Sequence, residues 1–292
     1  MKRQVGIYSV LKHAVLWICS LSCLIPFILL IISSFTEDST IALTGYSFFP
    51  KSWSLDAYRY LLGQGGKILH AYGISLFVTV FGTLAGLAMT LMLAYPLSRP
   101  DLPGRRIFSF YVLFTLLFNG GLVPSYIMWT TIFHIKNTIW ALVIPNLMVK
   151  AFFVIMARSY FKSNIPLEII ESARIDGASE IGIFTRIVLP LSKPIVSTLL
   201  LFIGLSYWND WNNGLIYLTD SSLYSIQNVL NEMIKSITSL STMGGSVSSM
   251  TTLPSNTVRM AIAVVGTLPV LMAYPFLQKG FVKGIVMGGV KG

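Results

Sequence analysis

Between Glu171 and Pro194 the chain reads ESARIDGASEIGIFTRIVLPLSKP, the longest polar island between two strongly apolar segments. Just before it, Pro166 suits the first turn of a helix, and Glu168 lies near the N-terminal end, where acidic side chains are favoured. Gly177 supplies the backbone freedom to leave that helix. The sequence therefore predicts two short helices joined by a bend at Gly177.

The second of these helices carries a stripe of apolar side chains. They recur at helical spacing until two prolines, Pro190 and Pro194, end the run, and they are Ile181, Phe184, Ile187 and Val188. Because the island is too polar to lie in lipid, something else has to cover this stripe. We expect residues 166–190 to meet a soluble partner.

Composition places the protein in a membrane. Of its 292 residues 54% are hydrophobic and only 11% are charged, whereas soluble chains have about 25% charged residues. The net charge is +10, but the basic residues are spread over several predicted cytoplasmic segments and do not form one patch. We therefore expect the protein to contact membrane lipid and not to bind nucleic acid. Cys19 and Cys23, the only cysteines, lie in the first apolar segment and indicate no disulfide and no metal site.

Hydropathy predicts an all-α polytopic membrane protein with six transmembrane helices in one domain, residues 1–292. Taking about 20 apolar residues as one crossing, the predicted crossings are residues 14–34, 72–97, 107–133, 138–160, 194–216 and 258–278. Most of the 21 Lys and Arg residues fall on the side of the two termini, which indicates that both termini are cytoplasmic. The first crossing is expected to be uncleaved, because no small-x-small cleavage site clearly follows it.

Two crossings carry further signals. The second contains Gly82 and Gly86 among other small residues, which allow transmembrane helices to approach closely. The third is interrupted by Asn119-Gly120-Gly121 and by Pro124. A helix broken at membrane depth leaves backbone groups unpaired, so this break is expected to face the pathway or a subunit interface.

Lys150 falls near the middle of the fourth crossing, where an ionisable side chain costs several kcal/mol unless it is paired or wet. Asn146 is expected one turn away on the same helical face. One interpretation is structural: Lys150 pairs with Asp210 or with a partner subunit, or the true bounds of the crossing lie a few residues away. The other is a polar site that binds an anionic part of a substrate, such as a uronic carboxylate.

A dense polar and aromatic cluster lies near the outer end of the fifth crossing. It combines flat apolar rings with amide donors and acceptors, which suits the CH faces and hydroxyls of sugar rings. Its candidate pathway residues are Trp208, Asn209, Asp210, Trp211 and Asn212, of which Trp208, Trp211 and Asn212 are expected on one helical face. The competing interpretation is an aromatic belt at the outer headgroup level.

The opening stretch resembles the "EAA" loop of permease subunits in bacterial ATP-binding-cassette importers. The matching residues are, in chain order, Glu171, Ala173, Asp176, Gly177, Ala178, Phe184, Ile187, Leu189, Pro190 and Pro194. Ser172 departs from the usual alanine, a small-for-small change. In that family this loop is the coupling helix, which docks in a cleft on the ATPase subunit, and the resemblance implies the same role for residues 166–190.

The resemblance extends over nearly the whole chain, to carbohydrate importer permeases of the maltose MalG type. Trp53-Ser54-Leu55-Asp56-Ala57-Tyr58, Ala94-Tyr95-Pro96-Leu97-Ser98-Arg99, Asn119-Gly120-Gly121-Leu122-Val123-Pro124 and Trp208-Asn209-Asp210 carry it. It implies the type I importer fold in the bacterial cytoplasmic (inner) membrane. The implied partners are a homologous second permease, two ATPase subunits and an extracytoplasmic solute-binding protein.

No phosphate loop or hydrolase motif occurs in the chain, so we do not expect it to be an enzyme or to bind a cofactor of its own. ATP and Mg are expected on the partner ATPase subunits. Within the resemblance, Lys150 and the basic external positions favour acidic oligosaccharides, such as alginate- or pectin-derived fragments, over neutral ones. Two rivals remain, a secondary transporter driven by an ion gradient and a membrane scaffold or channel. A secondary transporter is expected to have intramembrane carboxylates and internal repeats. A scaffold or channel leaves residues 171–194 unexplained.

Overall fold

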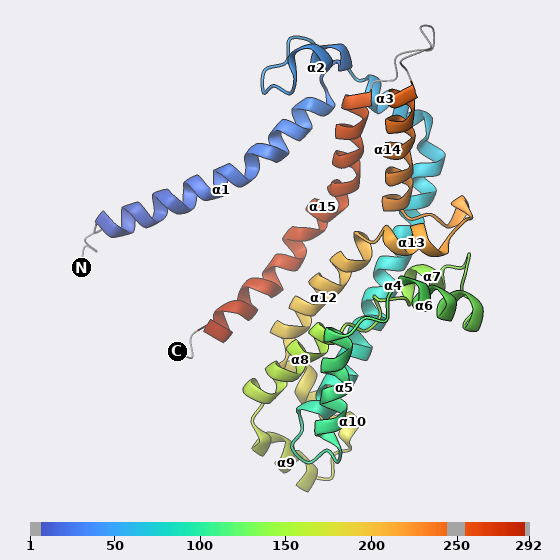
Figure 1. Cartoon of the computed structure of the whole chain (residues 1–292). Coiled ribbons are helices and arrows are strands. Elements are labelled where there is room, and N and C mark those ends of the chain that lie inside the picture. Colours follow the sequence, from blue (N-terminus) through green and yellow to red (C-terminus); the bar gives the residue numbers. More distant parts are fainter. Residues whose placement is uncertain (1–6, 244–254, 290–292) are drawn as a thin grey trace. The chain divides into compact units, whose positions relative to one another are not determined.

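The structure, a computed structural model, describes residues 7–243 and 255–289 (Figure 1). The described part of the chain is helical, and it contains no strand beyond an isolated bridge between Thr36 and Trp53. The predicted all-α class is therefore confirmed. The chain divides into two compact units, Met1–Ile68 with Leu230–Pro269, and Leu69–Val229 with Val270–Gly292.

The first unit contains the N-terminal helices and the beginning of the last one. Its helices are α1 (Ile7–Ser34), α2 (Asp38–Thr44) and α3 (Asp56–Gly63), together with most of α14 (Ile226–Met243) and the first part of α15 (Ser255–Gly289). Asp38 joins α2 to α15, because its Oδ1 accepts hydrogen bonds from the backbone amides of Asn256 at 2.8 Å and Thr257 at 3.1 Å. These are amides of the first turn of α15, which have no partner within their own helix.

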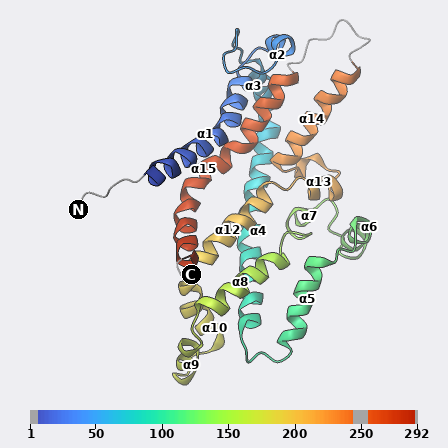
Figure 2. The ribbon, with the colours of Figure 1, turned by 60° about the vertical axis from the view of Figure 1, so that its left-hand side comes forward.

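The second unit carries the polar stretch. In chain order its elements are α4 (Gly65–Ser98, which begins in the first unit), α5 (Arg105–Leu117), α6 (Leu122–Ile127), η1 (Met128–Ile132), α7 (Trp140–Val143), α8 (Ala151–Asn164), α9 (Leu167–Ile175), α10 (Glu180–Ile183), η2 (Phe184–Val188), α11 (Leu189–Leu191), α12 (Lys193–Trp208), α13 (Asn212–Tyr217) and η3 (Ser221–Leu223). We call residues 166–190 the elbow. Figures 1 and 2 both place α9 and α10 at the far end of α8.

Glycines on α4 bring two long helices of this unit together. A Cβ added at Gly82 would lie 2.5 Å from the ring of Tyr207 on α12, and one at Gly86 would lie 2.9 Å from the carbonyl oxygen of Met148. Because ordinary carbon contacts are about 3.5–4.0 Å, only glycine fits at these two positions. The predicted close approach through small residues is confirmed there.

Helix lengths agree with some of the predicted crossings. Leu11–Ser34 and Gly65–Ser98 are continuous helices long and apolar enough to cross a membrane. The third predicted crossing is broken where the sequence predicted it, since α5 ends at Leu117, α6 begins at Leu122, and the two segments meet at 112°.

The fourth and fifth predicted crossings differ from the expected single helices. Residues 138–160 contain the short helix α7, then a non-helical stretch, and α8 begins only at Ala151. In the fifth, α12 ends at Trp208 and a separate helix, α13, begins at Asn212. The count of six crossings and the cytoplasmic position of both termini stay predictions.

Candidate functional site

The first helix of the elbow ends in a Schellman cap. The amide of Ala178 donates to the carbonyl of Ala173, and the amide of Gly177 donates to the carbonyl of Arg174, both at 3.0 Å. Gly177 has a φ of +78°, the left-handed conformation that this cap requires and that glycine adopts without a steric cost. The predicted bend at Gly177 is confirmed, and the spacing of Ala173, Asp176, Gly177 and Ala178 is the spacing of this cap.

The second helix of the elbow begins directly after the cap. The Ser179 side chain accepts a hydrogen bond from the amide of Gly182 at 3.2 Å and so caps α10. The chain then passes through the π-helical turn η2 and α11. The prediction that Pro190 ends the run is wrong, because Pro190 lies in the first turn of α11, where a missing amide is tolerated. The direction changes later, by 85° between Leu191 and Lys193.

The chain itself covers most of the apolar stripe. Val188 is fully buried, and the ring of Phe184 lies 5.2 Å from that of Tyr95 on α4. The expected cover of the stripe is therefore supplied mostly by the chain itself, and the soluble partner of residues 166–190 stays a prediction. Ile181 alone among its members has a large exposed fraction, 77%.

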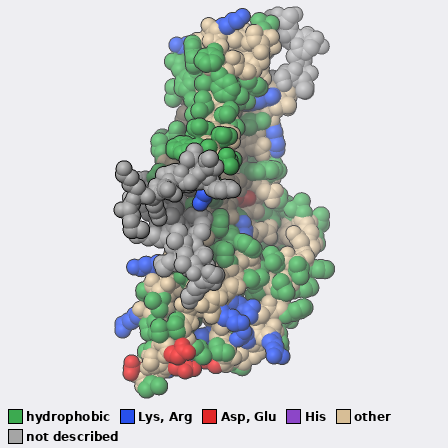
Figure 3. All heavy atoms as spheres, turned by 90° about the vertical axis from the view of Figure 1, so that its left-hand side faces the viewer, with side chains coloured by type: hydrophobic (Ala, Val, Ile, Leu, Met, Phe, Trp, Pro, Cys, Tyr) green, Lys and Arg blue, Asp and Glu red, His purple; other side chains and the backbone are tan. Residues whose placement is uncertain are grey.

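The exposed face of the elbow lies mainly on α9. Ile175, which the sequence analysis did not single out, is 87% exposed, and exposed acidic residues of the same helix and its cap surround it in sequence, namely Glu168, Glu171 and Asp176. In Figure 3 the largest group of acidic side chains lies at the lower end of the face shown, with Lys and Arg side chains beside it. Of the predicted coupling residues, Ala173 is buried and Leu189 is half-buried, whereas Glu171, Asp176, Gly177, Ala178 and Pro190 are exposed.

A network of charged residues, unassigned by the sequence analysis, joins the elbow to the end of α4. Arg174 donates from Nη1 to Asp101 Oδ2 at 2.8 Å and from Nε to Glu180 Oε1 at 2.6 Å. Arg99, which is buried, donates from Nε and Nη2 to the two oxygens of Asp101 at 3.1 and 3.2 Å. Tyr95 Oη donates to Glu180 Oε2 at 3.2 Å. The guanidinium groups of Arg99 and Arg174 hold the pKa of the Asp101 carboxyl well below its usual range.

The predicted pathway residues Asn146 and Lys150 do not share a helical face. Asn146 lies outside any helix with a φ of +58°, and Lys150 occupies the N-cap position of α8. Asn213, buried on α13, donates from Nδ2 to the carbonyl of Pro145 at 2.9 Å and fixes this non-helical stretch. The interruption leaves Lys150 Nζ 5.8 Å from the centroid of the Phe153 ring, within the range of a cation–π contact.

A shelf of aromatic side chains lies beside Lys150. The rings of Phe153 on α8 and Phe202 on α12 are parallel within 2°, with centroids 6.3 Å apart. They belong to a hollow of about 410 Å³, which is lined by Phe152, Phe153, Phe202, Leu205, Ser206 and Asn209. Aromatic rings, a hydroxyl and an amide in one hollow offer both the apolar face and the polar groups that a sugar ring requires.

The predicted cluster at residues 208–212 is divided by the end of α12. Trp208 is buried, 6.2 Å from the ring of Tyr72, whereas Asn209, Trp211 and Asn212 are exposed. The prediction that Trp208, Trp211 and Asn212 share a helical face was wrong, because no helix continues through residues 209–211. Asp210 accepts a weak hydrogen bond at Oδ1 from the amide of Asn213 at 3.5 Å.

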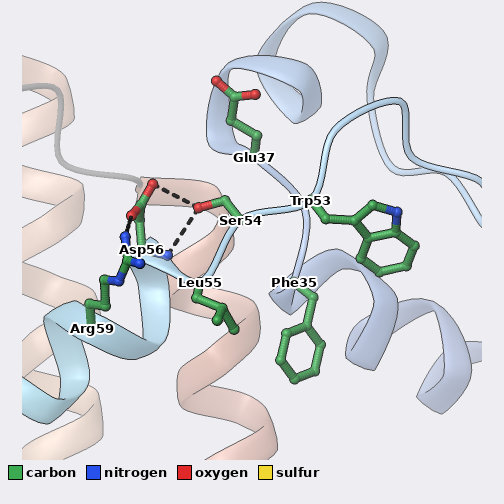
Figure 4. Close-up of a pocket in the computed structure, with 7 residues that line it drawn as sticks. All are labelled: Phe35, Glu37, Trp53, Ser54, Leu55, Asp56 and Arg59. Carbon is green, nitrogen blue, oxygen red and sulfur yellow. Dashed lines mark hydrogen bonds and ion pairs between the residues drawn. The ribbon is translucent and has the colours of Figure 1, made fainter.

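The segment Trp53–Tyr58 closes the turn after α1 in the first unit. The Ser54 amide donates to the carbonyl of Phe35 at 2.8 Å, and Asp56 pairs with both the Ser54 hydroxyl at 2.7 Å and Arg59 at 3.1 Å (Figure 4). The ring of Phe35 stacks on Tyr58 with centroids 4.7 Å apart. A cavity of about 540 Å³ between Phe35, Trp53 and Arg59 results, so these sequence positions are explained by the fold of the turn.

Comparison with known proteins gives one consistent result. Residues 73–286 match a family described as binding-protein-dependent transport system inner membrane component. The YtcP protein of Bacillus subtilis, named as a polygalacturonan/rhamnogalacturonan transport system permease, is 39% identical and the match covers 98% of this chain and 99% of that protein. The LplC protein of the same organism is 38% identical, with 92% of this chain and 90% of that protein covered.

A solved structure agrees with these relatives. The crystal structure of a bacterial ABC transporter involved in the import of the acidic polysaccharide alginate contains a chain that is 28% identical, with a TM-score of 0.76. The match covers 96% of this chain and 98% of that chain.

Proposed function

The chain belongs to the binding-protein-dependent transport system inner membrane component family, and on that basis we propose that it forms half of the membrane pathway of an ATP-driven oligosaccharide importer. It is a multi-pass permease of the cytoplasmic membrane and not an enzyme. In the proposed assembly a homologous permease completes the pathway and two ATPase subunits hydrolyse ATP. A solute-binding protein delivers the sugar from outside, and ATPase closure moves the elbow to produce alternating access.

The exposed elbow is the observation that supports this proposal best. Ile175 is 87% exposed, and a partner that covers such a side chain gains about 1.5–3 kcal/mol of binding free energy. Three exposed acidic residues, Glu168, Glu171 and Asp176, lie on the helix of Ile175 and its cap, whereas the exposed Arg174 beside it is already paired with Asp101 and Glu180. The acidic excess favours a partner with basic residues around an apolar cleft. An ATPase subunit with such a cleft is the partner that we assign to this face.

Ile175→Asp is expected to release the ATPase subunits from the purified complex and to reduce binding-protein-stimulated ATP hydrolysis by roughly tenfold or more, because it puts a charge into the apolar centre of the interface. Co-purification in detergent followed by an ATPase assay measures both effects. Leu43→Asp is the matched control, because Leu43 is 86% exposed on α2, far along the chain from the elbow. Retention of the ATPase subunits by the Ile175 variant would contradict the proposed docking face.

We propose that the transported sugars are acidic oligosaccharides. The aromatic hollow supplies a stacking surface, Ser206 and Asn209 supply hydrogen-bonding groups, and the ammonium of Lys150 beside Phe153 supplies a positive charge for a uronic carboxylate. A relative named for polygalacturonan and rhamnogalacturonan and a structure titled for alginate import support the same class of sugar.

Lys150→Met keeps the apolar stem and removes the charge. We expect uptake of an oligogalacturonate to fall by roughly tenfold and uptake of a neutral oligosaccharide of equal length to change less than about twofold, because a charge-assisted contact is worth about 1.5–3 kcal/mol. Uptake of both sugars by right-side-out vesicles provides the measurement. Lys162→Met, on the same helix α8, is the control. If the Lys150 variant takes up both sugars as well as the unmodified protein does, neutral oligosaccharides are the better assignment.

A further inference from the structure

Arg174 holds three segments of the chain together. It lies in the last turn of α9, and its two carboxylate partners are Asp101, in the turn after α4, and Glu180, the first residue of α10. The Arg174–Asp101 bond joins residues that are 73 positions apart. The Arg174 side chain therefore joins α9 to α10 across Gly177, and it also joins α9 to the turn after α4.

Both carboxylates are in turn held by residues at the end of α4. Arg99 donates two hydrogen bonds to Asp101, and Tyr95 donates one to Glu180. Tyr95 lies in the last turn of α4 and Arg99 directly follows the helix, so both donors lie at this end of α4. The ring of Tyr95 also packs against Phe184, the first residue of η2. We call Tyr95, Arg99, Asp101, Arg174 and Glu180 the clamp.

The clamp compensates for a weak point in the elbow. The backbone between α9 and α10 passes through Gly177, where an added Cβ would meet no atom within 4 Å. Ile170 and Ala173 of α9 pack in the same buried core as the end of α4, but this apolar contact is not directional and fixes the angle at the glycine less closely than paired charges do. The hydrogen bonds of Arg174 bypass the glycine directly.

We propose that Arg174 is a positioning residue for transport, which transmits the displacement of α9 to α4 through Asp101 and Glu180. This inference depends on the proposed docking of an ATPase subunit at the elbow. The Arg174 and Asp101 side chains are 41% and 44% exposed, and exposed ion pairs contribute little to stability. The clamp therefore fixes the position of α9 relative to α4 and contributes little to the stability of the subunit. Its loss should uncouple transport from ATP hydrolysis without unfolding the subunit.

Arg174→Gln in the complete transporter, reconstituted in proteoliposomes with its binding protein, provides the test. We expect the ATPase subunits to stay bound and ATP hydrolysis to change less than about twofold, while sugar transported per ATP falls roughly tenfold. Arg174→Lys should recover only part of this loss, because an ammonium lacks the planar fork that holds two carboxylates. Arg106→Gln, an exposed arginine at the start of α5, is the control and should transport normally.

Three outcomes separate the clamp from the proposed function. Normal sugar transport per ATP in Arg174→Gln would overturn the clamp. Loss of the ATPase subunits from that variant would also overturn it, because Arg174 would then belong to the docking face. Absence of sugar-stimulated ATP hydrolysis in the unmodified complex would instead overturn the proposed importer.

A chemical cross-link tests whether the connection stays closed during transport. Asp101→Cys with Arg174→Cys is made in a chain whose two free cysteines, Cys19 and Cys23, are replaced by serine. Before cross-linking, transport per ATP should be low, as in Arg174→Gln. A short bifunctional thiol reagent should restore it, with singly substituted chains as controls. If the cross-link instead leaves transport arrested, the two segments separate in the cycle and the clamp is not a permanent link.

Discussion

Gly177→Val is expected to reduce sugar uptake by the assembled importer by roughly tenfold or more, because a β-branched residue held in the left-handed region costs about 1–3 kcal/mol. Gly177 has a φ of +78° and closes the Schellman cap of α9. Valine would favour another backbone conformation and so change the angle between α9 and α10. Uptake by proteoliposomes, together with co-purification of the ATPase subunits, measures the effect.

Gly177→Asn is the matched control, because asparagine adopts the left-handed conformation far more readily than valine does. An added Cβ at Gly177 meets no atom of the chain within 4 Å, so the two variants differ inside this subunit by backbone preference and not by a clash. We expect the asparagine variant to keep at least about half of the uptake. Equal loss in both variants would mean that the partner tolerates no side chain there, and normal uptake in the valine variant would contradict the role of the bend.

The elbow could be predicted from the sequence because its signals are local. Pro166, the acidic first turn and Gly177 act within one turn of the helix end, and the structure places α9 and its cap accordingly. The clamp could not be predicted in the same way. In the sequence, Asp101 and Arg174 are charged residues of two separate polar segments. Only the fold brings Arg174 Nη1 within 2.8 Å of Asp101 Oδ2.

The fourth crossing shows the limit of hydropathy. Residues 138–160 are apolar enough to predict a membrane helix, yet hydropathy does not record where a helix is interrupted. The interruption depends on a distant residue, because Asn213 on α13 satisfies the carbonyl of Pro145 that a continuous helix would have used. Pro145 and Asn146, the latter in the left-handed region, were local signals of a turn, but Asn146 was interpreted as a pathway residue.

Gly82→Ala is expected to destabilise the folded subunit by about 1–3 kcal/mol, since overpacking a close helix contact costs that much. The added Cβ would lie 2.5 Å from two atoms of the Tyr207 ring, which is buried and whose hydroxyl donates to the carbonyl of Val143 at 2.9 Å. The ring cannot move away without weakening that bond. Gly73→Ala is the matched control on the same helix, because its Cβ meets no atom within 4 Å.

Alanine stabilises a helix by up to about 1 kcal/mol relative to glycine. In detergent the Gly73→Ala control should therefore unfold at the same temperature as the unmodified protein or at a higher one, whereas Gly82→Ala should unfold at a lower temperature. Equal unfolding temperatures for the two variants would show that α4 and α12 do not make this close contact in the membrane protein.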